Sequence, residues 1–523
     1  NGTLDDLYDP MLLKDMERAV SILCEAVDTG KKIRIVGDYD IDGVCSTYIL
    51  LQAFERLGSD VDFEIPDRIK DGYGINESII EQAHADGVEV ILTCDNGISA
   101  FHQVELAKKY GMTVVITDHH EVPLDGEKEK IPPADAVIDP KQADCPYPFP
   151  EICGAVVAYK LVQVLYARRG VPQMEWLDLL EFAAIATVGD VMKLQDENRI
   201  LVKYGLKKMA QTKNIGLRRL AEKNNLDLGA ITAYHIGFVI GPCLNAGGRL
   251  KTAKEALALL RAQSEEEAER LAEELKELND TRKDMTEQGT EAAKLQVESW
   301  YQKDKVLVVF LPECHESLAG IIAGRLREYY QKPAIVLTRG EEAVKGSGRS
   351  IDEYHMFKKL TEVSDLLLKF GGHPLAAGLS LEEKNIDEFR RRLNENAGLT
   401  EEDFKAKVWI DVPMPVGYVT ERLVRELSCL EPFGQGNEKP LFAEKSLRIR
   451  ASRVLGRNRN VVKMTLEETD GHAIEALYFG DGTAFEEERA GRREIDVVYY
   501  PDINEYNGRK TLQAVIRRYK FRG

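Results

Sequence analysis

Short apolar runs alternate with longer amphipathic stretches over the first part of the chain. Runs such as IRIVG, VEVILTC and TVVIT have the length of buried strands, and stretches with helical spacing lie between them. Strands that alternate with helices predict βαβ units, in which the strands are parallel and helices cover both faces of the sheet. We therefore expect an α/β domain from Lys31 to about Leu220, with functional residues beyond the carboxyl ends of its strands.

The hydrophobic spacing changes further along the chain. Between Thr252 and Lys303 the sequence is highly charged, has helical spacing and contains no Gly or Pro before Gly289, which predicts one or two long solvated helices joining two lobes. A second α/β segment then begins at KVLVVFLP and runs through PAIVLTR to FGGHPLAAGLSL. From about Val408 the strands are short and separated by turn signals, which predicts a small β-barrel.

The composition is that of a globular protein with several domains. The 523 residues, 44% apolar and 30% charged, are enough for three or four domains. No apolar run approaches the ~18 residues of a membrane span and no secretory leader is visible, so we expect a soluble, cytoplasmic protein without a membrane partner. The sequence begins with Asn1 and not with methionine, which leaves open that part of the natural N-terminus is absent.

Cysteine spacing and net charge exclude two classes of protein. The eight cysteines form no C-x-x-C pair and no zinc-like cluster, which favours thiols in a reducing compartment. A net charge of -18 argues against a surface that is basic throughout and grips nucleic acid everywhere. The segment from Leu441 to Gly523 nevertheless carries 16 Lys and Arg against 13 Asp and Glu. Contact with a polyanion is therefore expected to be local, with this segment as one candidate.

Acidic and histidine side chains recur at four predicted strand ends. The motifs GDYDIDG, TCDNGIS, TDHHE and AIATVGDVM supply Asp38, Asp40, Asp42, Asp95, Asp118, His119, His120 and Asp190. Carboxylates with imidazoles and without thiolates suit Mn²⁺ or Mg²⁺. Two such ions about 3.5 to 4 Å apart, bridged by one aspartate, would generate a hydroxide and stabilise an in-line phosphoryl displacement. The set therefore predicts a two-metal site.

Each motif also has a purely structural explanation. A D-x-D after a strand is often a helix N-cap and a turn, and Asp190 alone could cap a helix or hold a turn. An isolated Asp-His-His carries equally little information. The recurrence of all four motifs in the same place favours the metal site.

The chain resembles the RecJ-type family of single-strand DNA exonucleases, which belongs to the DHH phosphoesterase superfamily. The four motifs and GGHPLAAG resemble the superfamily, and stretches such as DPMLLKDM, GPCLNAGGRL and LEPFGQGNEKPLF resemble the family. The resemblance covers nearly the whole chain. It implies a parallel-sheet DHH catalytic domain over 1–215, a helical connector over 216–303, a second α/β domain (DHHA1) over 304–402 and an oligonucleotide-binding (OB) β-barrel over 403–523.

The resemblance implies removal of 5′-mononucleotides from the 5′ end of single-stranded DNA, with two Mn²⁺ or Mg²⁺ ions, in DNA repair and recombination. Strand polarity and the exclusion of duplex by a narrow passage come from the resemblance alone. It also suggests a single-strand-binding protein and a RecQ-type helicase as partners. Two alternatives stay open: a phosphodiesterase of short oligonucleotides or cyclic dinucleotides, which the C-terminal barrel disfavours, and a non-catalytic DNA-binding replication factor, which the intact acidic set disfavours.

Position by position, the resemblance implies a role for each candidate. The metal ligands are Asp40, Asp42, Asp95 as the bridging carboxylate, His119 and Asp190, with Asp38 as a further ligand or a residue that holds one in place. Asp118 is expected to orient His119, and His120 to face the scissile phosphate. The strand terminus and its phosphate are expected to be held by Arg68, Arg249, Arg282, Ser347, Arg349, Gly371, Gly372 and His373. For the last five, the alternative is two ordinary tight turns and a core histidine.

Two stretches depart from the family pattern, and the barrel carries its own candidates. Cys243 stands where arginine is usual, and CHESLAG, with Cys314, replaces a stretch that usually reads Trp-His-x-Gly, which bears on substrate length and processivity. A cationic groove with stacking aromatics would hold single strands without reading their sequence. The basic residues available for it are Arg448, Arg450, Arg453, Arg457, Arg459 and Lys463, and Tyr499, Tyr500 and Tyr506 follow them. Aromatic residues in a strand are more often part of the core than a stacking platform, so no individual tyrosine is singled out.

Overall fold

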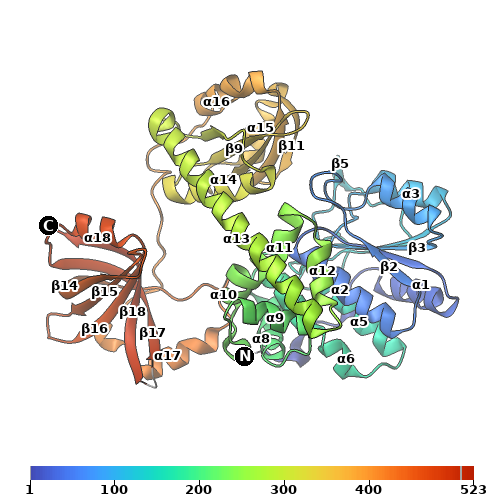
Figure 1. Ribbon diagram of the computed structural model, residues 1–523, viewed down its shortest axis with the longest axis horizontal. Coiled ribbons are helices and arrows are strands. Elements are labelled where there is room, and N and C mark those ends of the chain that lie inside the picture. The colour runs from blue at the N-terminus through green and yellow to red at the C-terminus, as the bar shows by residue number, and fades with distance from the viewer. Residues whose placement is uncertain (1, 507–508) are drawn as a thin grey trace. The chain divides into compact units, whose positions relative to one another are not determined.

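The computed structural model describes residues 2–506 and 509–523. These residues form two compact units (Figure 1). The larger unit consists of Asp6–Met192 and Asp196–Ala406, and the smaller unit consists mainly of Lys407–Gly523. No helix in the described part of the chain is long and apolar enough to cross a membrane. All eight cysteines are free thiols, as their spacing predicts.

A five-stranded parallel sheet organises the first half of the larger unit. Its strands are β1 (Ile33–Val36), β2 (Val61–Glu64), β3 (Val90–Cys94), β4 (Thr113–Thr117) and β7 (Ala136–Ile138), in the order β2-β1-β3-β4-β7. The apolar runs of β1 and β3 are buried at every position, as expected for a sheet covered on both faces. A short hairpin, β5 (Leu124–Asp125) and β6 (Lys128–Glu129), follows β4. The predicted βαβ architecture is therefore confirmed.

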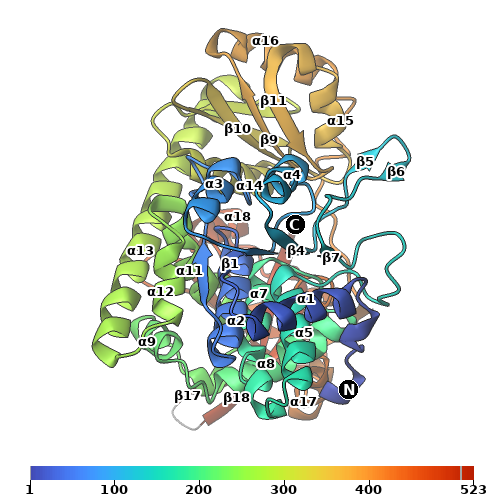
Figure 2. The same ribbon diagram turned by 90° about the vertical axis from the view of Figure 1, so that its right-hand side faces the viewer.

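Helices cover both faces of this sheet. On one face α3 (Glu77–Ala85) and α4 (Phe101–Lys109) bury Ile80 and Val104 against β3 and β4. On the other face lie α1 (Met16–Asp28), α2 (Ile41–Arg56) and α5 (Gly154–Arg168), with α6 (Gln173–Leu177), α7 (Leu180–Gly189) and α8 (Asp196–Met209) behind them (Figure 2). The sheet and its helices thus fix where each strand ends.

One predicted strand is a helix. The stretch before Asp190 forms α7, and Asp190 follows its last residue as the C-cap. Nine of the ten residues of α7, LEFAAIATVG, are apolar or small, and a continuous apolar run does not by itself distinguish a buried strand from a buried helix. Asp190 therefore approaches the sheet edge from the helical layer and not from a fourth strand end.

Helices also connect the two lobes of the larger unit. They are α9 (Ile215–Lys223), α10 (Ala233–His235), the π-helical turn η4 (Ile236–Ile240), α11 (Gly241–Leu250), α12 (Lys254–Leu260) and the long α13 (Glu265–Gln296). Ser264 caps α13 by accepting from the Glu267 N–H, and three glutamates in the first turn suit the positive end of the helix dipole. Figure 1 shows α13 running from α9, α11 and α12 towards α14, as the charged stretch predicts.

A second five-stranded sheet follows α13. Its strands are β8 (Leu307–Phe310), β9 (Ala334–Arg339), β10 (Val344–Arg349), β11 (Leu367–Gly372) and β12 (Ala376–Leu381), in the order β11-β12-β10-β9-β8. Only the β8–β9 pair is parallel among the described pairs of this sheet. The helices of this lobe are α14 (Ala319–Tyr330), α15 (Met356–Thr361) and α16 (Ile386–Glu395). This is the second α/β segment that the apolar runs predict.

The smaller unit is a six-stranded sheet with two helices. Its strands are β13 (Val412–Pro413), β14 (Phe442–Leu455), β15 (Val461–Glu467), β16 (Ala473–Phe479), β17 (Glu494–Tyr506) and β18 (Arg509–Arg522), and its helices are α17 (Glu421–Leu427) and α18 (Gly482–Arg489). The order is β13-β14-β15-β16-β18-β17, and β14 pairs in addition with β17. The inward-facing side chains form one apolar core, which includes Leu447, Val462 and Phe485.

Candidate active site

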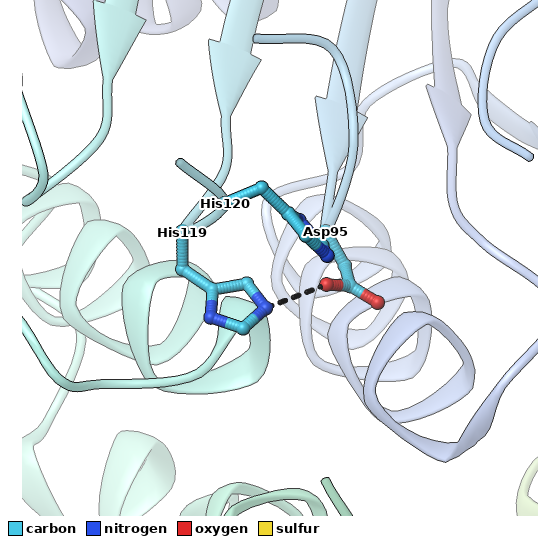
Figure 3. A group of neighbouring side chains, drawn as sticks. All are labelled: Asp95, His119 and His120. Carbon is cyan, nitrogen blue, oxygen red and sulfur yellow. Dashed lines mark ion pairs between the residues drawn. The ribbon is translucent and has the colours of Figure 1, made fainter. Parts of the chain in front are cut away.

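The acidic and histidine motifs of the first lobe meet at one edge of the parallel sheet. Three overlapping groups have ligand atoms within 4.8 Å of one another: Asp95, His119 and His120; Asp42, His119 and Asp190; and Asp38, Asp40 and Asp95. Figure 3 shows the first group, in which the His119 ring and the Asp95 carboxylate point towards each other. Asp95 and His119 each belong to two groups. The carboxyl ends of β1, β3 and β4, together with the C-terminus of α7, therefore bring together residues more than 150 positions apart in the sequence.

The first motif combines a helix cap with a candidate metal site. Asp40 Oδ1 accepts hydrogen bonds from the backbone N–H groups of Asp42 (3.0 Å) and Gly43 (3.1 Å) and so caps α2. A Cβ at Gly43 would lie 2.4 Å from the Asp38 carbonyl oxygen, so the tight turn requires glycine. The structural explanation of the D-x-D is thus correct for one oxygen of Asp40, and the same carboxylate still belongs to a candidate metal group.

Asp42 and Asp95 are held in place by the surrounding backbone. The two oxygens of Asp42 accept from the N–H groups of Gly154 and Ala155, both at 2.7 Å, at the first turn of α5. Asp95 has φ of 60°, the left-handed region, and a Cβ at Gly154 would lie 2.7 Å from the Asp95 Cβ. Asp42 and Asp95 are 1% and 2% exposed. The sequence thus places α5 directly against both carboxylates.

His119 lies at the centre of the cluster. Its Nε2 is 3.1 Å from Asp95 Oδ1, 3.4 Å from Asp42 Oδ2 and 3.9 Å from Asp190 Oδ2. Burial lowers the pKa of His119, which favours the neutral imidazole that binds a metal. Its Nδ1 has no hydrogen-bond partner among the described residues.

The carboxylates of the cluster repel one another. Burial, together with the neighbouring carboxylates, raises the pKa values of Asp38, Asp42 and Asp95, and it raises that of Asp190 to about 8. Asp38 Oδ2 and Asp95 Oδ1 are buried without a hydrogen-bond partner in the described part of the chain. Hard oxygen donors and one imidazole in this state fit Mn²⁺ or Mg²⁺, whose charge would keep the carboxylates ionised.

Asp118 orients His120. Its Oδ1 lies 2.8 Å from His120 Nδ1 and accepts from the His119 N–H at 2.8 Å, and its Oδ2 accepts from the Ile98 N–H at 2.9 Å. The expectation that Asp118 orients the ring of His119 is therefore corrected. Burial alone would lower the pKa of His120, but the hydrogen bond and charge of Asp118 outweigh it and raise this pKa to about 9. His120 is thus a cation beside the carboxylate cluster.

Three residues at the site are absent from the sequence-based set. The Tyr73 hydroxyl donates to the Asp95 carbonyl oxygen (2.6 Å) and lies 3.1 Å from His120 Nδ1. Asn96 is fully buried, donates to the Val36 and Cys94 carbonyl oxygens and accepts from the Ile75 N–H. Asp139 follows β7 directly, and burial raises its pKa to about 7. The glycines beside Tyr73, the position next to Asp95 and the apolar run before Asp139 were the available signals.

A cleft of about 680 Å³ with a cationic wall begins beside the cluster, at Tyr39, which stands between Asp38 and Asp40 in the sequence. Tyr39, Arg68, Arg249, Ser347 and Arg349 are among its lining residues. The Arg68 guanidinium lies over the Tyr39 ring at 4.8 Å, and Arg349 Nη1 donates to Ser347 Oγ at 3.1 Å and to the Gly348 carbonyl oxygen at 2.8 Å. Burial, and the charges of Arg68 and Arg282, lower the pKa of Arg249 to about 10. A wall of arginines that repel one another is suited to an anion.

A smaller cavity of about 110 Å³ adjoins this cleft, because Arg249 and Ile321 line both. Gly189, Gly237 and Arg282 are among its other lining residues. Asn279 Oδ1 accepts from Arg282 Nε (3.1 Å) and Nη2 (2.9 Å), and Asn279 Nδ2 donates to Cys243 Sγ (3.4 Å). Cys243, one of the two departures from the family pattern, is therefore buried behind Arg282. Cys314, the other, is half-buried near Gly289.

The glycine-rich turn between β11 and β12 lies outside both cavities. Gly371, Gly372 and His373 are exposed and are not among the described residues that line either one. Gly372 has φ of 145°, and a Cβ there would lie 2.4 Å from the Ala376 carbonyl oxygen, so this position requires glycine. The ion pair with Lys141 lowers the pKa of Glu121, and the charge of His373 adds to this effect. The turn thus faces the loop that follows the DHH motif.

The barrel candidates are only partly available for a ligand. Tyr499 is fully buried in the core, and its hydroxyl donates to the Met414 carbonyl oxygen. Arg450 pairs with Glu467, and Lys463 with Glu475. The Tyr500 ring lies 4.5 Å from Lys439 Nζ and 5.3 Å from Arg517 Cζ. The side chain of Tyr506 is outside the described part of the structure.

Comparisons with known proteins agree with this architecture. The family models of the DHH family N-terminal domain, the DHHA1 domain and the RecJ OB domain match residues 32–187, 303–398 and 410–518. The single-stranded-DNA-specific exonuclease RecJ of Escherichia coli is 35% identical over 527 residues, which cover 96% of this chain and 90% of that protein.

Two further relatives extend the comparison. RecJ of Bacillus subtilis is 38% identical over 516 residues, 98% of this chain, but the chain spans only 64% of that protein's length. The crystal structure of RecJ in complex with Mn²⁺ from Thermus thermophilus superposes with a TM-score of 0.84 at 30% identity, over 98% of this chain and 72% of that one. With its parallel-sheet DHH lobe, DHHA1 lobe and OB unit, the chain belongs to the RecJ family of DHH phosphoesterases.

Proposed function

We propose that this chain is a metal-dependent exonuclease that degrades single-stranded DNA from its 5′ end and releases 5′-mononucleotides. The observation that carries the proposal is the proximity of two half-sites: a cluster of imidazoles and buried carboxylates in which the carboxylates repel one another, and an arginine-lined cleft that begins at Tyr39, directly beside that cluster. Hydrolysis at a strand end uses both half-sites: metal ions would bind the scissile phosphate, and the arginine side chains would hold the end of the strand. Its membership of a family of single-stranded-DNA-specific exonucleases supports the same activity.

Six side chains would hold two Mn²⁺ or Mg²⁺ ions: Asp38, Asp40, Asp42, Asp95, His119 and Asp190. When bound, the ions would supply an activated water and neutralise charge on the phosphate. Asp95 belongs to two of the three ligand groups, which suits a bridging carboxylate. Hydrogen bonds from the first turn of α5 fix both oxygens of Asp42, so Asp42 would bind a metal ion in a defined direction. Cys243 and Cys314 lie outside this ligand set, and we place any effect of theirs on strand handling.

His120 would act on the phosphate itself. Asp118 holds Nδ1 and stabilises the protonated ring, so Nε2 can donate a proton to the leaving oxygen or a hydrogen bond to the phosphate. Tyr73 would steady this ring from the other side. Donating a proton requires that the imidazole of His120 is protonated, and Asp118 stabilises this form.

The arginine wall would set the polarity of degradation. Tyr39 stands between Asp38 and Asp40 in the sequence and also lines the cleft, so the wall begins directly beside the metal cluster. Arg68, Arg249 and Arg349, with Ser347, would bind a terminal 5′-phosphate, and cleavage would then fall one nucleotide from it. Gly371, Gly372 and His373 would act from the turn that faces the DHH loop, outside the cavity.

The smaller cavity would carry the rest of the strand. It runs from Gly189, beside Asp190, to Gly237 in the π-helical turn, and Arg282 lines it. We assign the preference for single strands over duplex to this narrow part of the site. The domain boundaries that we propose lie after residues 215, 303 and 402. The last domain, the OB unit, would bind the trailing strand.

The remaining expectations are also part of this proposal. We place the enzyme in the cytoplasm, in DNA repair and recombination, beside a single-strand-binding protein and a RecQ-type helicase that would provide unwound strands. A phosphodiesterase of cyclic dinucleotides is less suited to the chain, because the RecJ OB domain matches residues 410–518.

The test uses strands labelled at either end. The full chain with Mn²⁺ should release labelled mononucleotides at once from 5′-labelled single strands and late from 3′-labelled ones, and it should leave blunt duplex intact. Asp40→Ala should abolish release, whereas Asp125→Ala, at an exposed position, should not. Activity confined to dinucleotides, or binding without cleavage, would overturn the proposal.

A further inference from the structure

A second cleft, of about 370 Å³, lies in the helical layer of the first lobe. Its lining residues come from α2, α5, α7 and the segments that precede α9 and follow α12. Nothing in the proposed exonuclease reaction uses this cleft. Its buried floor includes the carboxyl group of Glu181 and the aromatic rings of Tyr48, Tyr166 and Phe182. Charged side chains of both signs, such as Lys213 and Asp178, also line the cleft.

The floor contains a buried acceptor that lacks a second partner. Glu181 is 4% exposed, and its Oε1 accepts from the Thr212 hydroxyl at 2.7 Å. Its Oε2 is buried with no hydrogen-bond partner within the described residues. A buried carboxylate oxygen without a donor is costly, so a ligand that brings an N–H group would be stabilised there. Burial also raises the pKa of Glu181 to about 7, which reflects the same deficit.

A hydroxyl donor and two packed aromatic rings adjoin this acceptor. The Tyr48 hydroxyl accepts from Asn214 Nδ2 at 3.1 Å, which leaves its own proton to be donated. Burial raises the pKa of Tyr48 to about 12, so Tyr48 stays protonated, and its ring packs against that of Phe182, the residue that follows Glu181. The Tyr48 and Phe182 rings pack at 4.3 Å between centroids. Acceptor, donor and ring faces together match the polar edge and the face of a nucleobase.

The chemistry of the floor selects among nucleobases. Adenine and cytosine present an amino donor next to a ring nitrogen that accepts, which pairs with Glu181 and Tyr48. Thymine presents one N–H between two carbonyls, so one carbonyl oxygen would face the Glu181 carboxylate and be repelled. The floor therefore favours a base with an exocyclic amino group.

The rim supplies exposed cations for a phosphate. Arg56 pairs with Glu175 at 2.5 Å, Lys213 with Asp178 at 2.8 Å, and Arg261 with Glu55. The Lys213 side chain is 83% exposed and that of Arg56 51%. Exposed ion pairs of this kind contribute little, so a phosphate with two charges can compete for the cations.

We propose that this cleft binds a nucleoside monophosphate whose base carries an exocyclic amino group, with Glu181 accepting from that amino group and Tyr48 donating to the adjacent ring nitrogen. The site is separate from the active site. Tyr48 lies six residues after Asp42 on α2, which is about 9 Å along the helix. Glu181 lies near the start of α7, nine residues and about 13 Å from Asp190, which follows the end of that helix. Figure 2 shows the region of α2 and α7 from which both sets of side chains come.

Equilibrium dialysis of labelled dAMP, dCMP and dTMP against the full chain tests the proposal. EDTA is present, so that ions do not promote binding at the active site. We expect saturable binding of one dAMP or dCMP per chain and at least tenfold weaker binding of dTMP. Equal affinities for dAMP and dTMP, or no saturable binding of dAMP, would contradict it.

Variants assign the binding to the cleft. Glu181→Gln keeps the shape and an acceptor for Thr212 but places an NH₂ group against the amino group of the base, and it should weaken dAMP binding at least tenfold. Lys213→Glu, at an exposed position that folding does not need, should weaken it severalfold. Asp95→Asn and Arg349→Gln should leave it unchanged. The reverse pattern would place the nucleotide in the active site. Strand degradation is measured separately, so failure here leaves the exonuclease proposal standing.

Discussion

The strand-end cluster and the arginine wall begin beside each other, at Asp38 and Tyr39, yet their electrostatic situations are opposite. In the cluster, burial and mutual repulsion raise the pKa values of Asp38, Asp95 and Asp190. In the wall, burial and neighbouring arginines lower the pKa values of Arg249 and Arg349. Each half therefore holds like charges in an unfavourable state. Direct ion pairs between the halves would relieve both, but Arg68 lies over the Tyr39 ring instead.

A structural ion pair in the same sheet shows what the fold does when charge only has to be neutralised. Arg34 on β1 is 7% exposed and binds Asp62 through Nε (2.7 Å) and Nη2 (2.8 Å), and it also binds Asp86. These bonds raise the pKa of Arg34 and lower that of Asp62. The comparison teaches that the two halves of the cleft are left unpaired for ligands of opposite sign, a cation on one side and a phosphate on the other.

The largest expected effect comes from removing one charge of the cluster. Asp95→Asn should lower the rate of strand degradation by roughly 10³-fold or more, because the bridging ligand loses its charge. Asparagine adopts the left-handed backbone conformation of Asp95 readily, so the fold should be kept. In EDTA, the free energy of unfolding should stay equal or rise, because one repelling carboxylate is gone.

Rates with Mn²⁺ and urea melts in EDTA measure these two effects. Asp125→Asn is the matched control, since Asp125 is exposed and should change neither quantity. A loss of stability in EDTA with Asp95→Asn would show that the cluster is balanced without a metal, and the comparison between the two halves would fail.

The arginine wall should respond through binding and not through metal affinity. Arg349→Gln should raise KM for 5′-phosphorylated strands by about 10- to 100-fold, the loss of one or two charge-assisted hydrogen bonds. Strands with a 5′-hydroxyl should be affected less. Mn²⁺ affinity, from calorimetric titration, should be unchanged.

Arg339→Gln controls for the loss of one positive charge on the same sheet, because Arg339 is exposed on β9 outside the cleft. An equal rise in KM for phosphorylated and unphosphorylated strands would remove the terminal phosphate from the wall.

At the smaller cavity, the rate of strand degradation should depend only on the size of the side chain at position 237. A Cβ at Gly237 would meet only Val188 Cγ1, at 3.6 Å, so Gly237→Ala should be tolerated. Gly237→Leu should fill the smaller cavity. Degradation of long single strands should then slow by about tenfold, because the leucine side chain occupies the space that the strand needs. Dinucleotides, which need no passage, should be cleaved at the normal rate. Equal effects of both variants on both substrates would contradict a passage here.

The smallest expected effect concerns His120, a cation beside the carboxylate cluster. The pKa of His120, about 9, lies above its ordinary value near 6.5, so the stabilisation is complete below about pH 6.5 and is lost as pH rises through 9. In Asp118→Asn the burial of His120 acts unopposed, and its pKa should fall to the ordinary value or below.

Urea melts in EDTA between pH 6 and 9.5 measure this contribution. The stability difference between the parent and Asp118→Asn should shrink with rising pH by on the order of 1 kcal/mol, because solvent screens a side chain that is 44% exposed. The lowered pKa of Asp118 acts at lower pH, outside this window. NMR titration of His120 checks the pKa directly. A difference that does not change with pH would assign Asp118 a purely structural role.

Much of the fold could be read from local pattern. Strands β1 and β3 of the parallel sheet are buried at every position, so they stand out as short apolar runs, and the charged stretch with helical spacing formed α13. The run before Asp190 was misjudged, because a helix buried on all sides has no amphipathic period to distinguish it from a strand.

The site was predictable where a ligand follows a strand directly. Residues such as Asp38, Asp95 and His119 satisfy this rule, and parallel strands bring their ends together. Partners that depend on side-chain direction were not predictable. That Asp118 holds His120 and not His119, that Tyr73 reaches both His120 and Asp95, and that Asn96 joins two strand ends all depend on rotamers and loop paths.

The sequence by itself determined the order of strands and helices, the family to which the chain belongs, and the residue types at the carboxyl ends of the strands. These depend on local hydrophobic period and on turn chemistry, which are encoded within a few residues. Only the tertiary structure decided which charges are left unpaired and which are neutralised, and only it revealed the cleft at Glu181. The reason is that burial, repulsion and hydrogen bonding act between residues that are close in space but far apart in the chain.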